Sequence, residues 1–110
     1  MPTFRKERMG EAIRKVITSK LIRDRAIVEN AMVTINRVDV TNDFQTARIF
    51  YSVFGSNVDE EQASAMMKEH QGEFRHEISK KLNLRRTPKI EFLYDRNTEY
   101  AFKIDGLLKH

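Results

Sequence analysis

The 110-residue sequence contains no cysteine, no tryptophan and only two prolines. The absence of cysteine excludes a disulfide scaffold, a thiolate zinc site and thiol catalysis, and it suits a reducing compartment. No apolar run approaches the ~20 residues of a membrane span. A hydrophobic content of 40% is nevertheless enough for one globular core. We therefore predict a single cytoplasmic domain over residues 1–110.

Motifs of catalysis are also missing. The sequence has no Gly-x-Ser-x-Gly elbow, no phosphate-binding glycine-rich loop and no His-Glu-x-x-His. Glu73 and His76 have the spacing of carboxylate-bridged metal helices, but such sites need a second pair, and the chain has three histidines. We interpret both residues as helix-surface side chains. The prediction is a protein that is not an enzyme and has no catalytic residue, metal site or cofactor.

Basic residues gather in two blocks. Residues 1–25 carry eight basic and three acidic groups, and residues 75–89 carry six basic groups and one acidic group. The rest is acidic or close to neutral, and the net charge of the whole chain is +4. Two cationic blocks on such a background favour a surface for a polyanion, although two ordinary solvated helix faces would give the same composition.

Periodicity predicts a helix followed by a hairpin. Residues 5–22 place apolar side chains at the i, i+3, i+4, i+7 spacing of one buried helical stripe. Residues 33–40 and 47–54 alternate as strands, joined by a turn at 41–43. The apolar phase of the first strand changes near Asn36-Arg37, which predicts a β-bulge.

The second half predicts helix, break, helix and strand. Asp59 can cap a helix that runs to Leu82, and we place a kink at His70, Gln71 and Gly72. Pro88 begins a strand over residues 90–94, and residues 97–110 are expected to form a short closing turn. The predicted fold is α+β, in the order α-β-β-α-kink-α-β, with helices on one face of a three-stranded sheet. This is the order of a type II KH domain, here KH-like.

The glycines argue against the usual KH mode of binding. They are Gly10, Gly55, Gly72 and Gly106, so no two are three residues apart and no Gly-x-x-Gly loop exists. Gly10 stands inside the first helix, where glycine costs ~1 kcal/mol, so it indicates a close packing approach.

A set of positions along the chain resembles one family. They are Arg5, Arg8, Met9, Gly10, Ile13 and Lys15 in the first helix, Val33-Thr34-Ile35, Val38, Asp43-Phe44, Ala47, Ile49 and Tyr51-Ser52-Val53 in the hairpin, and Gly72, Phe74-Arg75, Leu82, Leu84-Arg85, Pro88, Ile90, Phe92 and Asp95 beyond. Together, from about Arg5 to Leu108, they resemble the bacterial ribosome-binding factor A family. Two positions depart from it. Arg23-Asp24-Arg25 lacks the family's usual proline, which leaves that loop's conformation open, and His70 replaces the alanine common at the kink.

The resemblance implies a ribosome maturation factor. Such a protein binds free small ribosomal subunits and their RNA and assists late small-subunit assembly and rRNA processing, including growth in the cold. The implied partners are the small subunit and its rRNA, with an assembly GTPase as an optional one, and we expect a monomer. The predicted RNA-binding residues are Arg5, Arg8, Arg14, Lys15, Arg75, Lys80, Lys81, Arg85 and Arg86.

Two alternatives concern amphipathic elements. The basic first helix could instead hold a peripheral protein on a membrane, although its stripe lacks tryptophan and phenylalanine. Phe50 and Phe54 share one face of the second strand and could stack on bases. Aromatic residues at such positions more often pack beneath helices, and we favour that interpretation, although alternation alone does not decide which face is covered.

Overall fold

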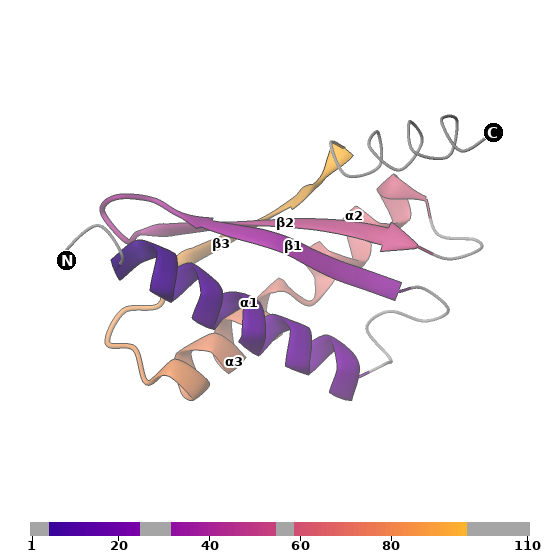
Figure 1. Cartoon of the computed structure of the whole chain (residues 1–110). Helices are drawn as coiled ribbons and strands as arrows, with labels where there is room; N and C mark the ends of the chain where they lie inside the picture. Colours follow the sequence, from indigo (N-terminus) through magenta and orange to yellow (C-terminus); the bar gives the residue numbers. More distant parts are fainter. Residues whose placement is uncertain (1–4, 25–31, 55–58, 97–110) are drawn as a thin grey trace.

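Three helices cover one face of a three-stranded sheet in the computed structural model, which describes residues 5–24, 32–54 and 59–96 (Figure 1). The elements in chain order are α1 (Arg5–Arg23), β1 (Met32–Val40), β2 (Thr46–Phe54), α2 (Glu60–Glu69), α3 (Gln71–Leu82) and β3 (Lys89–Tyr94). This confirms the α+β class and the predicted order. Arg25 of the loop after the first helix, residues 55–58 and the predicted closing turn at 97–110 lie outside the described residues.

The sheet has the strand order β1-β2-β3. β1 and β2 are antiparallel, whereas β3 runs parallel to β2 because α2 and α3 carry the chain back across the sheet. The β1–β2 register shifts between the pairs Ile35–Tyr51 and Arg37–Phe50, so Asn36 is the extra residue of a bulge. The predicted bulge is therefore confirmed.

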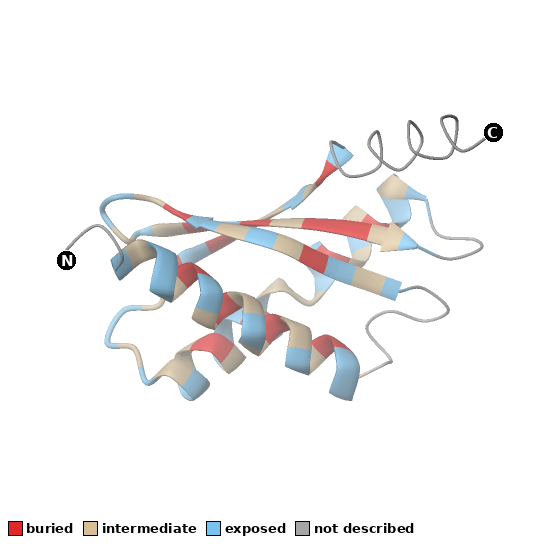
Figure 2. Cartoon of the chain, in the orientation of Figure 1, coloured by how far each residue is buried: buried red, intermediate tan, exposed pale blue. Residues whose placement is uncertain are grey.

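The core lies between the sheet and the helices, where the buried residues line the inner surfaces of both layers (Figure 2). Every element contributes to it. Its buried apolar residues are Ile13, Ile17, Leu21, Ile35, Val40, Ala47, Ile49, Tyr51, Ala63, Met67, Phe74, Ile78 and Ile90. Gly10 lets α1 approach the sheet, because a Cβ built there would stand 2.7 Å from the carbonyl oxygen of Val38. The close approach predicted at this glycine is confirmed.

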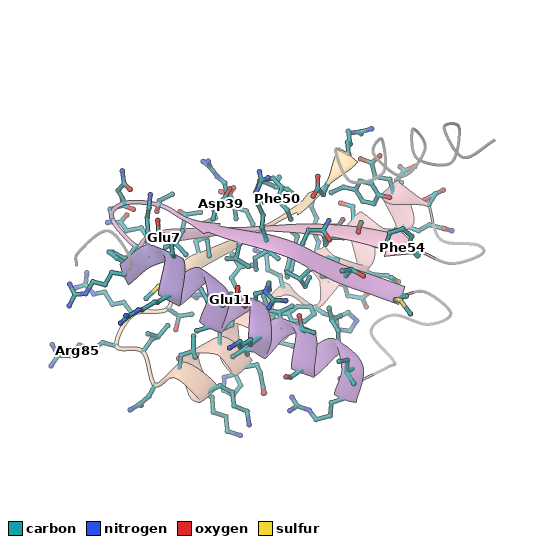
Figure 3. All side chains as sticks on the ribbon, viewed as in Figure 1. Glu7, Glu11, Asp39, Phe50, Phe54 and Arg85 are labelled. Carbon is teal, nitrogen blue, oxygen red and sulfur yellow. The ribbon has the colours of Figure 1, made fainter. Side chains whose placement is uncertain are left out.

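The favoured prediction that Phe50 and Phe54 of β2 pack beneath the helices is wrong. The helices cover the side of β2 that carries Ala47, Ile49 and Tyr51, all of which are at most 1% exposed. Phe50 and Phe54 therefore project from the opposite face of the sheet (Figure 3). The physical reason lies in the pairing of β2 with β1. The core-facing residues of β1, such as Ile35 opposite Tyr51, continue the apolar surface of β2. On the opposite face of the sheet, charged residues of β1 stand beside β2 and interrupt the apolar surface.

The break between the helices falls at His70, the first of the three residues at which the kink was predicted. His70 ends α2 and precedes α3 with φ −99° and ψ 10°, whereas Gln71 and Gly72 already belong to α3. Gly72 does not adopt a left-handed φ, and a Cβ there would meet no atom within 4 Å. The kink thus does not depend on the conformational freedom of Gly72, and α3 begins at Gln71.

Candidate nucleic-acid interface

The fold brings the start of α1 and the end of α3 to the same end of the domain. The last turn of α1 lies beside the first half of α3, because Arg23 pairs with Glu77 at 2.9 Å and Lys20 lies 3.8 Å from Glu73. The two helices therefore run in opposite directions, as Figure 1 shows. Consequently the two basic blocks, which residues 26–74 separate in sequence, meet at one end.

The loop between α3 and β3 presents arginines at this end. α3 ends at Asn83, whose left-handed backbone (φ 52°, ψ 46°) turns the chain away from the helix axis. Arg75 donates a hydrogen bond to the carbonyl of Thr87 at 3.1 Å and so braces the loop from α3. Arg85 and Arg86 are exposed between these two anchors, and Arg85 points away from the body of the domain (Figure 3).

The first turn of α1 and the start of β3 lie at this same end of the domain, and both contact the β1–β2 turn. Lys6 donates to the side-chain oxygen of Asn42 at 2.9 Å, which fixes α1 against the β1–β2 turn. The amide of Lys89 donates to the carbonyl of Gln45 at 2.8 Å, on the other side of that turn. The turn is thus a common support for the cations of both blocks.

We define the basic end as the exposed cations that the two helices, the loop and the start of β3 place there: Arg5, Arg8, Lys80, Lys81, Arg85, Arg86 and Lys89. None of them forms an ion pair with another residue in the described ranges. Lys15 is also exposed and without such a pair, further along α1. Cations without internal partners are free to bind phosphates, which fixes position but does not read sequence.

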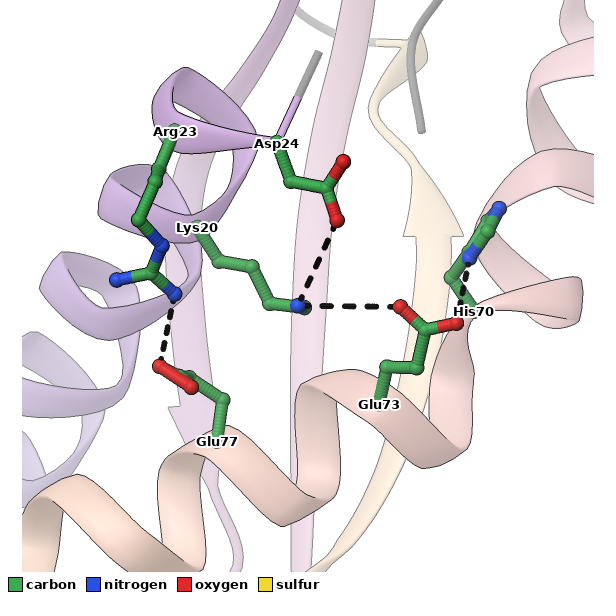
Figure 4. A network of polar contacts seen from close by, with 6 residues as sticks. All are labelled: Lys20, Arg23, Asp24, His70, Glu73 and Glu77. Carbon is green, nitrogen blue, oxygen red and sulfur yellow. Dashed lines mark hydrogen bonds and ion pairs between the residues drawn. The ribbon is translucent and has the colours of Figure 1, made fainter. Parts of the chain in front are cut away.

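Other cations of the first block are occupied by carboxylates at the opposite end of α1 (Figure 4). Lys20, whose side chain is 13% exposed, extends its ammonium group between Asp24 and Glu73. The hydrogen bond from Arg23 lowers the pKa of Glu77, with the positive charge of Arg23 adding to the effect. These pairs hold α1 to α3, so Lys20 and Arg23 stabilise the helix pair instead of adding to the basic end.

Two predicted phosphate ligands also have internal contacts. Arg14 forms a hydrogen-bonded ion pair with Glu11 one turn away, which lowers the pKa of Glu11 and raises the pKa of Arg14. Arg75 binds the loop carbonyl described above. Of the nine predicted RNA-binding residues, the structure therefore brings six to the basic end, with Lys15 nearby and Arg14 and Arg75 engaged elsewhere. Their role in binding RNA stays a prediction.

Sequence reasoning missed Lys89 as a member of this end. Lys89 belongs to the second basic block, but it directly precedes the predicted strand over residues 90–94, and a predicted strand does not by itself reveal at which end of the fold it begins. The signal was the proline before it: Pro88 starts β3 beside the β1–β2 turn, and the turn lies under α1.

The described residues do not assemble a metal centre or a membrane-binding stripe. No group of three or more histidine, aspartate or glutamate side chains is arranged to hold a metal within the described ranges. Glu73 of the candidate metal pair instead accepts from His70 and lies near Lys20. The apolar stripe of α1 is buried against the sheet, so it is not available to a lipid surface. Among the described helices, none is long and apolar enough to span a bilayer.

The fold and this surface define a KH-like α+β domain with a concentrated, unpaired positive charge at one end. A family model described as ribosome-binding factor A matches residues 5–108, and the chain belongs to this family. Its members are ribosome-binding factors and not enzymes.

Individual relatives agree in sequence and in fold. Ribosome-binding factor A of Caldanaerobacter subterraneus subsp. tengcongensis is 34% identical over 109 residues, which cover 96% of this chain and 88% of the relative. The crystal structure of ribosome-binding factor A from Thermus thermophilus has a TM-score of 0.68 at 17% identity and covers 83% of this chain and 97% of its own. A Thermus thermophilus ribosome-binding factor A fitted into a cryo-EM map of its 30S complex has a TM-score of 0.62 at 17% identity, covering 77% and 89% of the two chains.

Proposed function

We propose that this protein binds the free small ribosomal subunit through its basic end and assists the late maturation of that subunit. The observation that supports the proposal most directly is the convergence of unpaired cations from α1, α3, the following loop and β3. Membership of the family supports the ribosome as the partner, and the Thermus thermophilus relative was fitted into a complex with the 30S subunit.

The basic end would hold phosphates of the small-subunit rRNA. Arginine and lysine bind phosphate through charge-assisted hydrogen bonds, and they release counterions from the RNA. The helices carry Arg5, Arg8, Lys80 and Lys81 on a rigid frame, because apolar side chains of both helices are fully buried in the core: Ile13 and Ile17 of α1, and Phe74 and Ile78 of α3. The core therefore sets the backbone positions of these four helical cations before RNA is bound.

A binding protein of this kind changes RNA only by differential affinity. If the basic end fits the phosphate arrangement of one rRNA conformation better than that of its competitors, binding shifts the population toward that conformation. Such a shift would assist rRNA processing by favouring the conformation that the processing enzymes accept. This shift in population would matter most in the cold, where misfolded RNA conformations rearrange slowly. We propose that the protein performs this role in the cytoplasm as a monomer. An assembly GTPase remains an expectation from the family resemblance.

Charge reversal tests the proposal. We expect Arg85→Glu combined with Arg86→Glu to weaken binding to purified small subunits by about tenfold or more, since hydrogen bonds to charged groups contribute ~1.5–3 kcal/mol. Lys81→Glu should weaken binding by a smaller factor. The matched control is Lys68→Glu, because Lys68 is also an exposed helical lysine without an ion pair among the described residues but lies on α2.

Affinity is measured by sedimentation of the labelled protein with small subunits, and each variant is checked by its melting temperature. Equal losses for Lys81→Glu and Lys68→Glu would contradict the proposal, because they would mean that net charge matters and the position of the cations does not.

A further inference from the structure

The sheet face opposite the helices carries an ordered arrangement of side chains. Two rows cross the three strands, one residue from each strand, as the pairing registers define. The first row is Asp39, Arg48 and Glu91, and the second is Arg37, Phe50 and Leu93. We call these six residues the mixed-charge patch. Figure 3 shows Asp39 and Phe50 projecting from this face, away from the helices.

An arginine stacked on an aromatic ring forms the centre of the patch. The guanidinium carbon of Arg37 lies 4.0 Å from the centroid of the Phe50 ring, and Nε of Arg37 donates to Asp39 at 3.2 Å. This stack depends on the bulge at Asn36, because the shifted register is what places Arg37 opposite Phe50. Bulges often redirect a side chain at a functional position. The stack holds Arg37 in one orientation before any partner binds.

The charges of the patch cancel. Arg37 is paired with Asp39, and Arg48 lies 3.5 Å from Glu91, so two positive and two negative groups surround Phe50 and Leu93. A polyanion would meet both carboxylates and gain no net attraction. Protein surfaces, in contrast, bind to patches in which arginine and aromatic residues form the centre and charges of both signs form the rim. Leu93, with 37% of its surface exposed, supplies further apolar area.

The patch adjoins the basic end. Lys89 stands opposite Thr46 in the β2–β3 register, and the row that contains Arg48 and Glu91 follows two residues later. A ribosomal subunit that binds the basic end through its RNA would therefore bring its neighbouring surface to the patch. On such a subunit the neighbouring surface is either more RNA or a ribosomal protein, and the charge balance of the patch favours the protein.

We propose that the mixed-charge patch binds a protein of the small ribosomal subunit that lies beside the RNA held by the basic end. This inference rests on the proposed function. The partner surface would place an apolar side chain against Phe50 and Leu93, with an acceptor for the guanidinium of Arg37. RNA would fix the domain on the subunit, and the protein contact would distinguish an assembled subunit from bare RNA of the same sequence.

Two substrates separate the two contacts. Binding is measured at one salt concentration to intact small subunits and to the rRNA extracted from them. We expect Phe50→Ala to weaken binding to intact subunits by about tenfold, the loss typical of a central interface residue, and to leave binding to the extracted rRNA within about twofold of the parent. Leu93→Ser, a second variant at the same site, should show the same selectivity with a smaller loss. Ile22→Ser is the control, because Ile22 is 67% exposed on α1, away from the patch.

Each other outcome has a defined meaning. Equal losses on subunits and on extracted rRNA would overturn the assignment to a protein, because they would mean that the patch binds RNA. Unchanged binding to both substrates by both patch variants, or a parent dimer that Phe50→Ala converts to a monomer, would also overturn it. A parent protein that binds neither substrate would refute the proposed function and this inference with it. If the parent binds both substrates but the patch variants weaken both equally, only this inference fails and the proposed function stands.

Discussion

Replacing Gly10 with alanine should destabilise the protein, although alanine is the better helix former. The new Cβ would stand 2.7 Å from the carbonyl oxygen of Val38, well inside the ~3.3 Å at which carbon and oxygen touch. Both groups belong to backbones that the core fixes, so α1 must move away from β1. Overpacking of this kind costs ~1–3 kcal/mol, whereas the gain in helix propensity is ~1 kcal/mol. We therefore expect a net loss of about 1 kcal/mol, or roughly 4–8 °C in Tm.

The same substitution at Gly72 provides a control within one chain. Gly72 is exposed in α3, and a Cβ there would meet no atom within 4 Å. Gly72→Ala should therefore raise stability by up to ~1 kcal/mol, because only the propensity of the helix changes. Thermal and urea unfolding followed by circular dichroism measure both variants. If Gly10→Ala stabilised the protein as much as Gly72→Ala, α1 and β1 would not be in the close contact on which the packing argument depends.

Further predictions concern the ends and the pairing of helices. Asp59→Ala should cost about 1 kcal/mol in urea unfolding, because the Asp59 side chain accepts from the Gln62 amide at 2.8 Å and completes a capping box; an unchanged midpoint would contradict this. Glu77→Gln should reduce stability at neutral pH. Because Arg23 lowers the pKa of Glu77 in the folded state, its contribution is present above the unfolded pKa of ~4.3 and is lost as pH falls through the folded pKa. The difference between parent and variant should therefore shrink below about pH 4, and a difference independent of pH would refute the ion-pair explanation.

The order of elements could be predicted because local patterns determine it. The alternation of β2, the change of phase at Asn36 and the capping residue Asp59 each depend on neighbours in sequence, and the structure confirms all three. The covered face of β2 could not be predicted in this way. Both faces of β2 contain apolar side chains. The face that the helices cover is the one that continues into the apolar face of β1, and the β1–β2 register decides which face that is.

The kink shows a different limit. Glycine marks positions where a helix can break, but the break at His70 arises where two helices each pack against the sheet, through Met67 on one side and Phe74 on the other. Sequence therefore placed the break correctly among three residues but did not give its cause. In the candidate site, the two basic blocks were visible in the sequence, but their meeting at one end and the pairing of Lys20 and Arg23 with carboxylates of α3 required the antiparallel arrangement of α1 and α3.

The salt dependence of binding to small subunits tests the central claim most directly, which is that the basic end holds rRNA phosphates. For about four to six phosphate contacts, the logarithm of the association constant should fall with the logarithm of salt concentration with a slope of about −3 to −5. Replacing Arg85 and Arg86 with alanine should reduce the magnitude of that slope by about 1.4–1.8, since each lost contact removes ~0.7–0.9. A flat titration, or a slope that the double variant leaves unchanged, would contradict the account.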